Sequence, residues 1–365
     1  MGSGRRSLEG VGMKDLSFYN GKKVLITGHT GFKGGYLSTL LVRAGARVTG
    51  YSLEPPTDPS LFELCKLDRD MNSIIGDVRD FDKMSKVFAE ERPEIVFHLA
   101  AQPIVRLSYK EPRLTFETNV MGTVNLMECV RNTSSVWSVL NVTTDKVYKN
   151  DDLDIAFTED MPLDGFDPYS NSKSCSELVT HSYVKSFFSE KDAPRISTAR
   201  AGNVIGGGDF APDRLIPDCV RAAGKGEEIL IRNPGSTRPF QHVMEPVMVY
   251  ADIAMRLYED HSYADYYNVG PDLSDVKSAL ELAEIFCREW GEGLSIRTGQ
   301  EGGPHEAAFL KLDCTKIKEK LGWKSVWNVE EAVKQTVLFS RVYYNGGDLR
   351  EELFRQIDSY VSDSE

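Results

Sequence analysis

Short apolar runs and amphipathic helical patterns alternate through about the first two hundred residues of the chain. The runs are rich in Val, Ile and Leu with little polar alternation, which is typical of parallel strands buried on both faces. Strands that alternate with helices predict an α/β fold built on a Rossmann-type doubly wound parallel sheet. We expect strands at residues 22–27, 47–52, 72–75, 94–102, 136–142 and 196–201.

The first of these runs ends in a glycine-rich turn, and a helix follows it directly. Leu37, Leu40 and Leu41 recur at helical spacing, and Gly45 supplies a stop. The first glycine permits the tight turn, the second lets the backbone approach a pyrophosphate, and the third lets the helix pack closely on the strand. We expect a dinucleotide site, although the Gly-x-x-Gly-x-x-Gly spacing also fits a turn that binds nothing. The cofactor-binding candidates here are Gly28, His29, Thr30, Gly31, Phe32, Lys33 and Gly34.

A tyrosine and a lysine, Tyr169 and Lys173, lie four positions apart in an expected helix at residues 169–188. Residues at this spacing share a helix face, so the lysine can stabilise the tyrosine phenolate and lower its pKa. A free tyrosine titrates near ~10 and is a poor base at neutral pH. The pair alone is a weak signal, because an exposed aromatic beside a lysine is common. Together with the glycine turn, it indicates a hydride-transfer enzyme.

Further candidates follow the third and fourth strands. Asp77 and Val78 could lie beside an adenine, and a surface turn explains Gly76-Asp77 equally well. The small residues Ala100 and Ala101, followed by Gln102, suit a close approach of the backbone to a cofactor. His98 lies inside the fourth apolar run, and we expect it to be a core histidine rather than a catalyst.

Polar residues stand at the carboxyl end of the fifth strand, where ligands bind in open α/β sheets. Thr144, Asp145 and Lys146 are therefore candidates for chemistry, and Thr143 is a candidate for cofactor binding. The alternative is a polar loop that caps the next element, since threonine and aspartate are good helix caps. The downstream Tyr169 and Lys173 favour the catalytic interpretation.

Length, charge and cysteine usage bound the class of protein. A chain of 365 residues exceeds the usual size of one core, so we expect two domains. A net charge of −12 argues against nucleic acid as a partner. The six cysteines show no Cys-x-x-Cys pair and the six histidines no ligand spacing, so we expect neither disulfides nor a metal site. Without a signal peptide or a membrane span, a cytoplasmic enzyme is the expectation.

The domain boundaries are expected to interleave. Residues 1–13 read as an added or disordered segment, with Met13 as a natural start, and residues 346–365 read as a charged helical tail. Trp323 and Trp327 are expected to anchor the core of the smaller domain. We assign residues 14–203 with about 239–270 to the dinucleotide-binding domain, and about 204–238 with 271–345 to a smaller mixed α/β substrate domain.

Several blocks, taken in order, resemble the extended short-chain dehydrogenase/reductase family, and within it the nucleotide-sugar 4,6-dehydratases. The resemblance runs from about Lys22 to the last helices and is strongest to the branch that acts on CDP-glucose. An ordered series of blocks is more specific than any single motif. The blocks are Gly28–Gly34, His98–Pro103, Thr143–Lys146, Asp167–Ser170, Arg200–Asp209 and Arg238–Val243.

The resemblance implies a reaction in three steps. Tyr169 removes the proton of the glucose C4 hydroxyl while C4 gives hydride to the nicotinamide; water then leaves from C5 and C6, and the hydride returns to C6. Thr144 resembles the hydroxyl that holds the C4 oxygen, and Lys173 the lysine that binds the nicotinamide ribose. Asp145 matches the acid for the departing C6 hydroxyl, which requires a carboxyl kept protonated by its pocket.

Lys146 departs from the better-known dTDP-glucose dehydratases, in which the corresponding residue is glutamate, the presumed C5 base. The branch that acts on CDP-glucose resembles this chain in having lysine. The C5 base therefore stays open: Lys146 takes the proton if its pKa is depressed, or it acts electrostatically on the enolate while another group takes the proton.

The cofactor preference rests on the end of the second strand. A classical NAD site has a carboxylate there, whereas this chain has Ser52, which we take as a cofactor-binding candidate. An arginine that would favour NADP is also absent at that point, while His29 and Lys33 could reach a 2′-phosphate. We expect NAD rather than NADP.

The second half of the chain supplies substrate-binding candidates. Arg214 and Arg238 suit the pyrophosphate of a nucleotide sugar, and a surface salt bridge is the alternative for each. Asn203 follows the sixth strand, and Leu215 and His305 resemble nucleotide-proximal positions of the family.

Two other functions stay open. A sibling epimerase or reductase would use the same Tyr169 and Lys173 without elimination, and a non-catalytic dinucleotide-binding protein would keep only the fold. A dehydratase that acts on another nucleotide sugar is a further variant. Helices at residues 121–131 and 169–188 could build a four-helix subunit interface, so we expect a homodimer or a tetramer made of dimers.

Overall fold

The computed structural model describes residues 16–364 apart from 152, 292 and 300–308. The predicted N-terminal segment at residues 1–13 and the candidate His305 lie outside the described residues.

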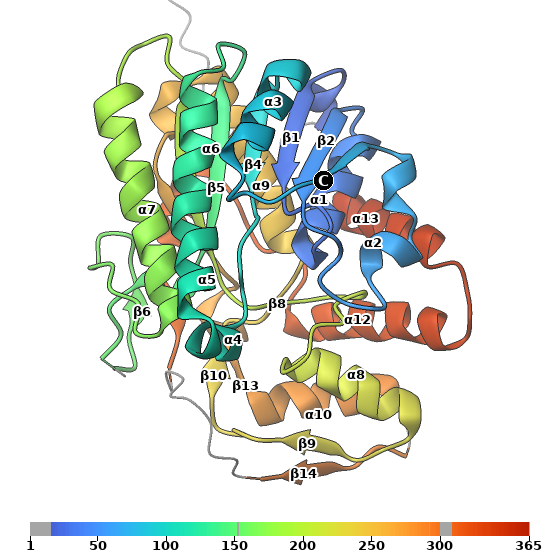
Figure 1. Ribbon diagram of the computed structural model, residues 1–365. Helices are drawn as coiled ribbons and strands as arrows, with labels where there is room; N and C mark the ends of the chain where they lie inside the picture. Colours follow the sequence, from blue (N-terminus) through green and yellow to red (C-terminus); the bar gives the residue numbers. More distant parts are fainter. Residues whose placement is uncertain (1–15, 152, 292, 300–308, 365) are drawn as a thin grey trace, which may run out of the picture.

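A sheet of seven parallel strands forms the centre of the molecule, in the order β12-β7-β5-β4-β1-β2-β3 (Figure 1). The strand order reverses direction beside β1, which confirms the predicted doubly wound α/β fold. The strands are β1 (Lys23–Thr27), β2 (Arg47–Ser52), β3 (Asn72–Ile75), β4 (Ile95–His98), β5 (Ser138–Thr144), β7 (Arg195–Ala201) and β12 (Tyr266–Val269).

Two strand ends differ from the prediction. The fourth strand ends at His98, so residues 99–102 lie beyond it. The fifth strand extends through Thr143 and Thr144, which were expected to follow it. β-branched threonines fit a pleated ladder, and both of these pair with β7, opposite Arg200 and Ala201.

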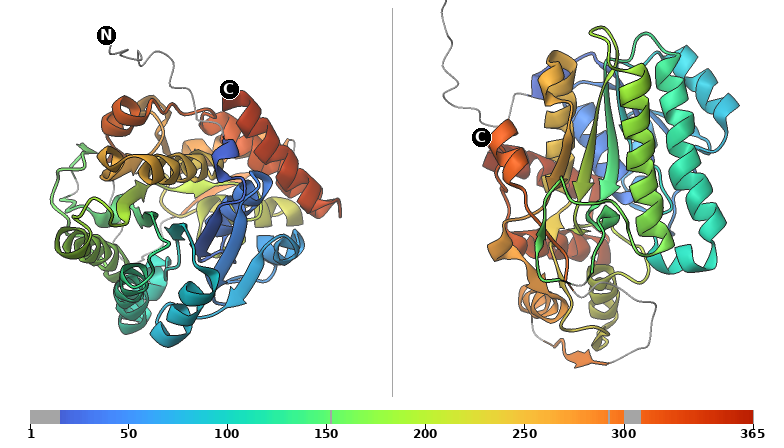
Figure 2. Two further views of the ribbon diagram at one scale, coloured as in Figure 1. Left: turned by 90° about the horizontal axis from the view of Figure 1, so that it is seen from above. Right: turned by 90° about the vertical axis from the view of Figure 1, so that its left-hand side faces the viewer.

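Helices cover both faces of the sheet because successive strand residues point to opposite sides. Val24 and Ile26 face the core beneath α1 and α9, whereas Leu25 faces the core beneath α3 and α6. The view from above in Figure 2 shows the sheet between these two helical layers. The covering helices are α1 (Phe32–Arg43) and α9 (Met244–Glu259) on one face, and α3 (Phe81–Glu91), α6 (Gly122–Arg131) and α7 (Pro168–Phe187) on the other.

A smaller region lies beyond the carboxyl ends of the strands, at the bottom of Figure 1. Its own apolar cluster combines residues of four elements with Ile205, Phe240 and part of α12 (Val329–Tyr344). These four elements are α8 (Leu215–Lys225), β9 (Ile229–Ile231), α10 (Ala279–Trp290) and β14 (Ile296–Thr298). The exact domain boundaries stay a prediction.

Short elements complete the fold. A π-helical turn, η3 (Glu117–Met121), separates α5 from α6. The other helices are α2 (Leu61–Leu64), α4 (Val105–Lys110), α5 (Pro112–Phe116), α11 (Thr315–Leu321) and α13 (Leu349–Ser364). The short strands are β6 (Ala156–Phe157), β8 (Val204–Ile205), β10 (Thr237–Arg238), β11 (Gln241–His242), β13 (Lys277–Ser278) and β15 (Lys311–Leu312).

The two C-terminal tryptophans lie in a different core from the one predicted. Trp323 and Trp327 are buried, but in the cluster shared with the sheet and α9 rather than in that of the smaller region. Trp327 packs edge-on against His242 and Tyr360. The tail forms α13, which buries Tyr360 in the same cluster as the sheet, while α12 contributes to both clusters.

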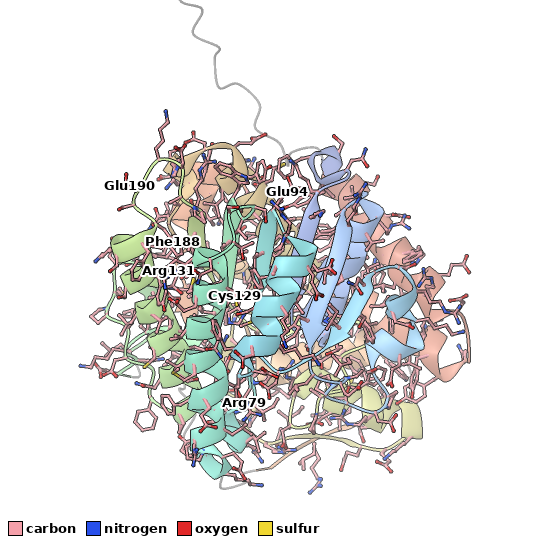
Figure 3. All side chains as sticks on the ribbon, turned by 45° about the horizontal axis from the view of Figure 1, so that its top comes forward. Arg79, Glu94, Cys129, Arg131, Phe188 and Glu190 are labelled. Atoms are coloured by element: carbon pink, nitrogen blue, oxygen red, sulfur yellow. The ribbon has the colours of Figure 1, made fainter. Side chains whose placement is uncertain are left out.

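The six cysteines all lie within the described residues. All six cysteines are free, and Cys129 is buried between α6 and α3, whereas the nearby Arg131 is exposed (Figure 3). The described residues hold no group of three or more His, Cys, Asp or Glu side chains fit for a metal ion. None of the helices in the described part of the chain is long and apolar enough to cross a membrane.

Candidate active site

The glycine turn has the geometry that a dinucleotide requires. Gly28 has a φ of +82°, and a Cβ there would lie 2.8 Å from the Ala100 nitrogen. A Cβ on Gly34 would lie 2.0 Å from the Gly28 carbonyl oxygen, so only glycine lets α1 start against this turn. α1 begins after Gly31, whose position carries no side-chain cap. The first-turn amides and the helix dipole therefore favour a phosphate here.

His29 and Lys33, the two residues considered for a 2′-phosphate, have different surroundings. The His29 ring is fully buried against Gly50, its Nε2 lies 2.7 Å from the Ser73 hydroxyl, and burial lowers its pKa to about 4. It is therefore neutral at pH 7 and offers no cation. Lys33 interacts electrostatically with Asp145 and Lys173, on the catalytic side of the turn. These surroundings do not favour a 2′-phosphate at the glycine turn.

The end of β2 presents hydroxyls instead of a carboxylate. Thr30 Oγ1 lies 2.9 Å from Ser52 Oγ and donates to the Leu53 carbonyl. On the neighbouring β3 end, the Asp77 carboxylate binds Arg79 through both oxygens, and this contact, opposed by burial, lowers its pKa. Asp77 thus forms an ion pair on the turn, and Val78 beside it is buried against Gly122.

The segment after β4 is held by a buried asparagine. Asn119, which the π-helical turn carries, accepts from the Gln102 amide at 2.8 Å and donates to the Gln102 carbonyl at 3.1 Å. Ala100 and Ala101 lie between this clamp and Gly28. His98 is a core residue, as predicted: its ring nitrogens contact the hydroxyls of Thr27 and Thr123.

Thr144 and Asp145 form a buried pair at the carboxyl end of β5. The Thr144 hydroxyl donates to Asp145 Oδ1 at 2.9 Å, while Oδ2 is buried with no hydrogen-bond partner among the described residues. Burial raises the pKa of Asp145, although Lys146, Thr144 and Arg238 oppose the shift. A carboxyl with one unsatisfied buried oxygen suits a group that carries a proton.

Tyr169 and Lys173 extend from the first turns of α7 toward this pair. Asp167 caps the helix by accepting from the Ser170 amide at 3.0 Å. Burial raises the pKa of Tyr169 to about 12, and a hydrogen bond with Thr144 opposes the rise. The predicted lowering by Lys173 is therefore wrong for this arrangement, since the Lys173 ammonium donates to the Val142 carbonyl at 3.1 Å. Burial and Lys33 lower the pKa of Lys173 to about 8.

The substrate candidates reach the same site from the smaller region. Arg214, at the start of α8, forms an ion pair with Asp209 at 3.0 Å. Burial, and then repulsion from the positive charge of Arg214, lower the pKa of Lys33 to about 8. Arg238 is buried on β10 and acts on Asp145. Leu215 is the first residue of α8, and Asn203 is partly buried after β7, with its carbonyl accepting from the Gln241 amide.

Sequence reasoning missed one partner of the site, Glu177, and part of the surroundings of another, Lys33. Lys33 was assigned to the cofactor turn, yet its charge also acts on Asp145 and on Lys173. Glu177 was not considered, although its place four residues after Lys173 on α7 was a visible signal. The hydroxyl of Thr143, a cofactor candidate, donates to Glu177 at 2.6 Å and is therefore turned into the protein.

Comparison with known proteins places this site in a family. A family model described as GDP-mannose 4,6 dehydratase matches residues 25–336. The chain belongs to the GDP-mannose 4,6 dehydratase family. A CDP-glucose 4,6-dehydratase of Salmonella typhimurium is 45% identical over 355 residues, which cover 96% of this chain and 99% of that protein.

Two solved structures share the fold of this chain at low sequence identity. An epimerase from Methanothermobacter thermautotrophicus has a TM-score of 0.78 and 22% identity, covering 93% of this chain and 97% of the other. A dTDP-glucose 4,6-dehydratase from Bacillus anthracis, in complex with NAD, has a TM-score of 0.72 and 21% identity, covering 91% and 99%. At this identity, the likeness concerns the fold.

Proposed function

We propose that this member of the family is a CDP-glucose 4,6-dehydratase, which converts CDP-glucose to CDP-4-keto-6-deoxyglucose and water with internally recycled NAD. The observation that carries the proposal is the meeting of Thr144, Asp145, Tyr169 and Lys173 at the carboxyl end of β5, within electrostatic reach of Lys33 on the glycine turn. The near full-length relative of Salmonella typhimurium supports CDP-glucose as the substrate.

Each side chain has a separate task in this reaction. Tyr169 takes the proton of the C4 hydroxyl, and Thr144 orients that oxygen through its own hydroxyl. Lys173, one turn along the helix, supplies a hydrogen-bond donor and a positive charge that would hold the nicotinamide ribose. NAD, when bound, accepts the C4 hydride and later gives it back at C6.

Asp145 is the acid for the elimination. A departing hydroxide is a poor leaving group, so a proton must reach the C6 oxygen as the bond breaks. Burial of Asp145 favours its protonated form, as this role requires. An epimerase has no need for such an acid, which is why dehydration is preferred to the sibling epimerase or reductase.

We assign the removal of the C5 proton to the part of the site that carries Lys146. Lys146 is partly exposed and opposes the rise in the pKa of Asp145, so its charge acts within the catalytic pocket. Lys146 either takes the proton or stabilises the enolate, and the two roles stay open. In both cases, removing its amine removes the elimination step rather than the C4 oxidation.

NAD is preferred to NADP on the geometry of the adenosine end. Ser52 and Thr30 pair their hydroxyls at the tip of β2, and the nearby His29 is neutral and buried. A 2′-phosphate would add charge where these three residues provide none. NAD in the complex of the Bacillus anthracis relative is consistent with this preference.

The diphosphate of the substrate is assigned to Arg214 and Arg238, and its nucleoside side to Asn203, Leu215 and His305. Arg214 is partly exposed and already paired with Asp209, so a diphosphate would compete for one face of the guanidinium. The interleaved division into a dinucleotide-binding domain and a substrate domain fits this placement, because α8 and β10 bring both arginines to the end of the sheet.

The test is to incubate the purified protein with CDP-glucose, dTDP-glucose, UDP-glucose and GDP-mannose separately, with NAD present, and to record product masses. Loss of one water from CDP-glucose alone, without net reduction of NAD, is the expected result. An unchanged mass with an altered sugar configuration would identify an epimerase. No change in any sample would favour a non-catalytic dinucleotide-binding protein.

A further inference from the structure

A buried carboxylate continues the catalytic face of α7. Tyr169, Lys173 and Glu177 lie four residues apart on this helix, so they form a ladder along one face. The Glu177 side chain is fully buried, and Lys173 is 5% exposed. Burying a carboxylate is costly unless it is fully paired. Its contacts therefore decide what it does beside the lysine.

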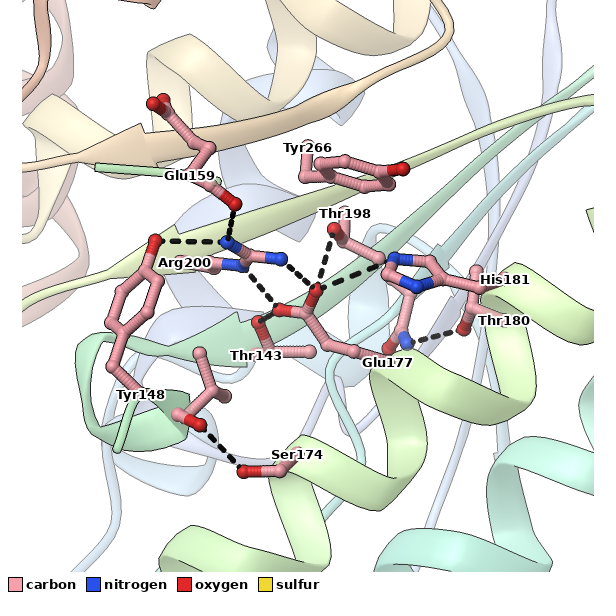
Figure 4. Close-up of polar contacts among 12 residues, drawn as sticks. Thr143, Tyr148, Glu159, Ser174, Glu177, Thr180, His181, Thr198, Arg200 and Tyr266 are labelled. Atoms are coloured by element: carbon pink, nitrogen blue, oxygen red, sulfur yellow. Dashed lines mark hydrogen bonds and ion pairs between the residues drawn. The ribbon is translucent and has the colours of Figure 1, made fainter. Parts of the chain in front are cut away.

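Both oxygens of Glu177 accept hydrogen bonds from three side chains, and His181 Nε2 lies 3.9 Å from Oε2 (Figure 4). Arg200 donates through Nε to Oε1 at 2.8 Å and through Nη2 to Oε2 at 2.6 Å. Thr143 donates to Oε1 at 2.6 Å, and Thr198 donates to Oε2 at 3.3 Å. Each of these three hydrogen-bond partners is a donor, as an ionised carboxylate requires, because a protonated carboxyl would have to donate. Glu177 is therefore a fixed negative charge.

Arg200 is itself held in place from its far side. Its Nη1 donates to the Tyr148 hydroxyl at 2.9 Å and to the Glu159 carbonyl at 3.0 Å. The guanidinium carbon also lies 5.0 Å from the centre of the Tyr148 ring and 5.3 Å from that of Tyr266. Arg200 on β7 stands opposite Thr143 on β5 in the sheet register, so both donors come from neighbouring strands.

The ladder attaches two consecutive turns of α7 to two consecutive residues of β5. Lys173 donates to the Val142 carbonyl at 3.1 Å, and Glu177 accepts from the adjacent Thr143. A rotation of the helix about its axis would break both contacts. The position of Lys173 and that of Glu177 are therefore set together.

Charged groups approach Lys173 from three elements. Lys33 on α1 disfavours its protonated form, Glu177 on α7 favours it, and burial also disfavours it. On β4, the fully buried ring of His98 has its pKa lowered to about 3 by burial and then by Lys173, so it stays neutral. Tyr169 is the neutral group one turn before Lys173 on α7. Arg200 is the cation that pairs with Glu177, and His181, four residues further along α7, lies 3.9 Å from Oε2 with its pKa lowered by burial.

We propose that Glu177, fixed by Arg200 and Thr143, is a positioning residue that holds Lys173 against β5 and keeps its ammonium charged at the alkaline end of the working range. The proposal rests on the proposed function in one respect, which is that Lys173 must be charged for turnover. Glu177 acts through the lysine and does not touch the substrate.

The test compares Glu177→Gln with the unchanged protein in two measurements. The first is the pH profile of kcat for CDP-glucose dehydration with NAD. The second is the titration of Lys173 itself, by carbon-13 NMR of the chain labelled at lysine Cε, with its signal assigned from Lys173→Arg. We expect the alkaline limb of the profile and the Lys173 titration to move to lower pH by about one unit or more.

Two further variants separate charge from folding. Glu177→Gln leaves Arg200 buried without its partner and could fail to fold, so Glu177→Leu with Arg200→Met removes both charges together, which is often tolerated. This double variant should shift the Lys173 titration in the same direction but by a smaller amount, because the positive charge of Arg200 is removed together with the carboxylate. Thr198→Val removes the 3.3 Å bond but keeps the carboxylate, so its alkaline limb and Lys173 titration should match the unchanged protein.

Each outcome bears on one claim. If folded Glu177→Gln and the double variant both titrate like the unchanged protein, Glu177 is only structural and the proposal is overturned. If the unchanged protein fails to dehydrate CDP-glucose, the proposed function fails, while the NMR titration still decides whether Glu177 controls the charge of Lys173. A shift in Thr198→Val as large as in Glu177→Gln would also contradict the proposal.

Discussion

At the scale of single residues, the site works by placing ionisable groups where their usual protonation is unfavourable. Asp145 is 1% exposed and its raised pKa comes first from burial. Lys173 and Lys33 are shifted the other way, each to a pKa of about 8. The environment of each side chain, rather than its residue type alone, therefore sets its pKa.

Asp145→Asn should stabilise the fold while abolishing dehydration. The folded-state pKa of Asp145 lies above its unfolded value. The carboxyl therefore does not lower the free energy of unfolding below pH about 4, where it is protonated in both states, and it lowers that free energy progressively as the pH rises from there through the folded-state pKa. The variant should therefore unfold at higher urea than the unchanged protein at pH 7, with the gap closing toward acid pH. A gap independent of pH would refute the buried-acid assignment.

Lys146→Ala should keep the first half-reaction and lose the second. The amine is not part of the Thr144–Asp145 bond or of the Tyr169 contact, so C4 oxidation should survive. A single-turnover experiment should show reduced nicotinamide accumulating while dehydrated product falls by ~100-fold or more, a typical loss for a missing acid–base group. Turnover at the unchanged rate would remove Lys146 from the mechanism.

At the scale of elements, the strands could be predicted well from the sequence, whereas the networks of side-chain contacts could not. Continuous apolar runs such as Val24–Ile26, stopped by glycine, determine a buried strand locally, so the sheet could be foreseen. The π-helical turn with Asn119, and the pairing of Glu177 with Arg200, depend on contacts between residues far apart in sequence. The same holds for Trp327, which packs on His242 rather than on its sequence neighbours.

The close approach of α1 to the glycine turn gives a prediction at the scale of elements. Gly34→Ala places a Cβ 2.0 Å from a backbone oxygen that cannot move aside, so α1 must shift. Overpacking of this kind costs ~1–3 kcal/mol, and we expect that loss in urea unfolding together with weaker NAD binding by calorimetry. Gly235→Ala is the matched control, since a Cβ there meets nothing within 4 Å. Equal NAD affinity in the two variants would contradict the assigned phosphate site.

At the scale of the whole molecule, α7 and the π-helical turn that precedes α6 expose apolar side chains. Leu178 is 53% exposed, Phe187 49% and Met121 49%. We propose that these exposed surfaces pair in a homodimer or in a tetramer made of dimers, as a four-helix contact. An exposed apolar face shared by two neighbouring helices is a common docking surface.

Leu178→Glu should dissociate this assembly. A charge buried in an apolar interface is unfavourable, so light scattering should give a smaller mass for the variant than for the unchanged protein. Leu273→Glu is the control, because Leu273 is 54% exposed but lies on a different surface. A monomeric unchanged protein, or an equal effect of both variants, would count against the interface.

The central claim is that one hydride leaves C4 and returns to C6 of the same sugar within this site. Its most direct test is to incubate the protein and NAD with CDP-glucose deuterated at C4 and to locate the label in the product by NMR. The proposed function predicts a 4-keto-6-deoxy sugar with deuterium at C6 and no net reduction of NAD. Deuterium left at C4, or released into reduced cofactor without dehydration, would contradict it.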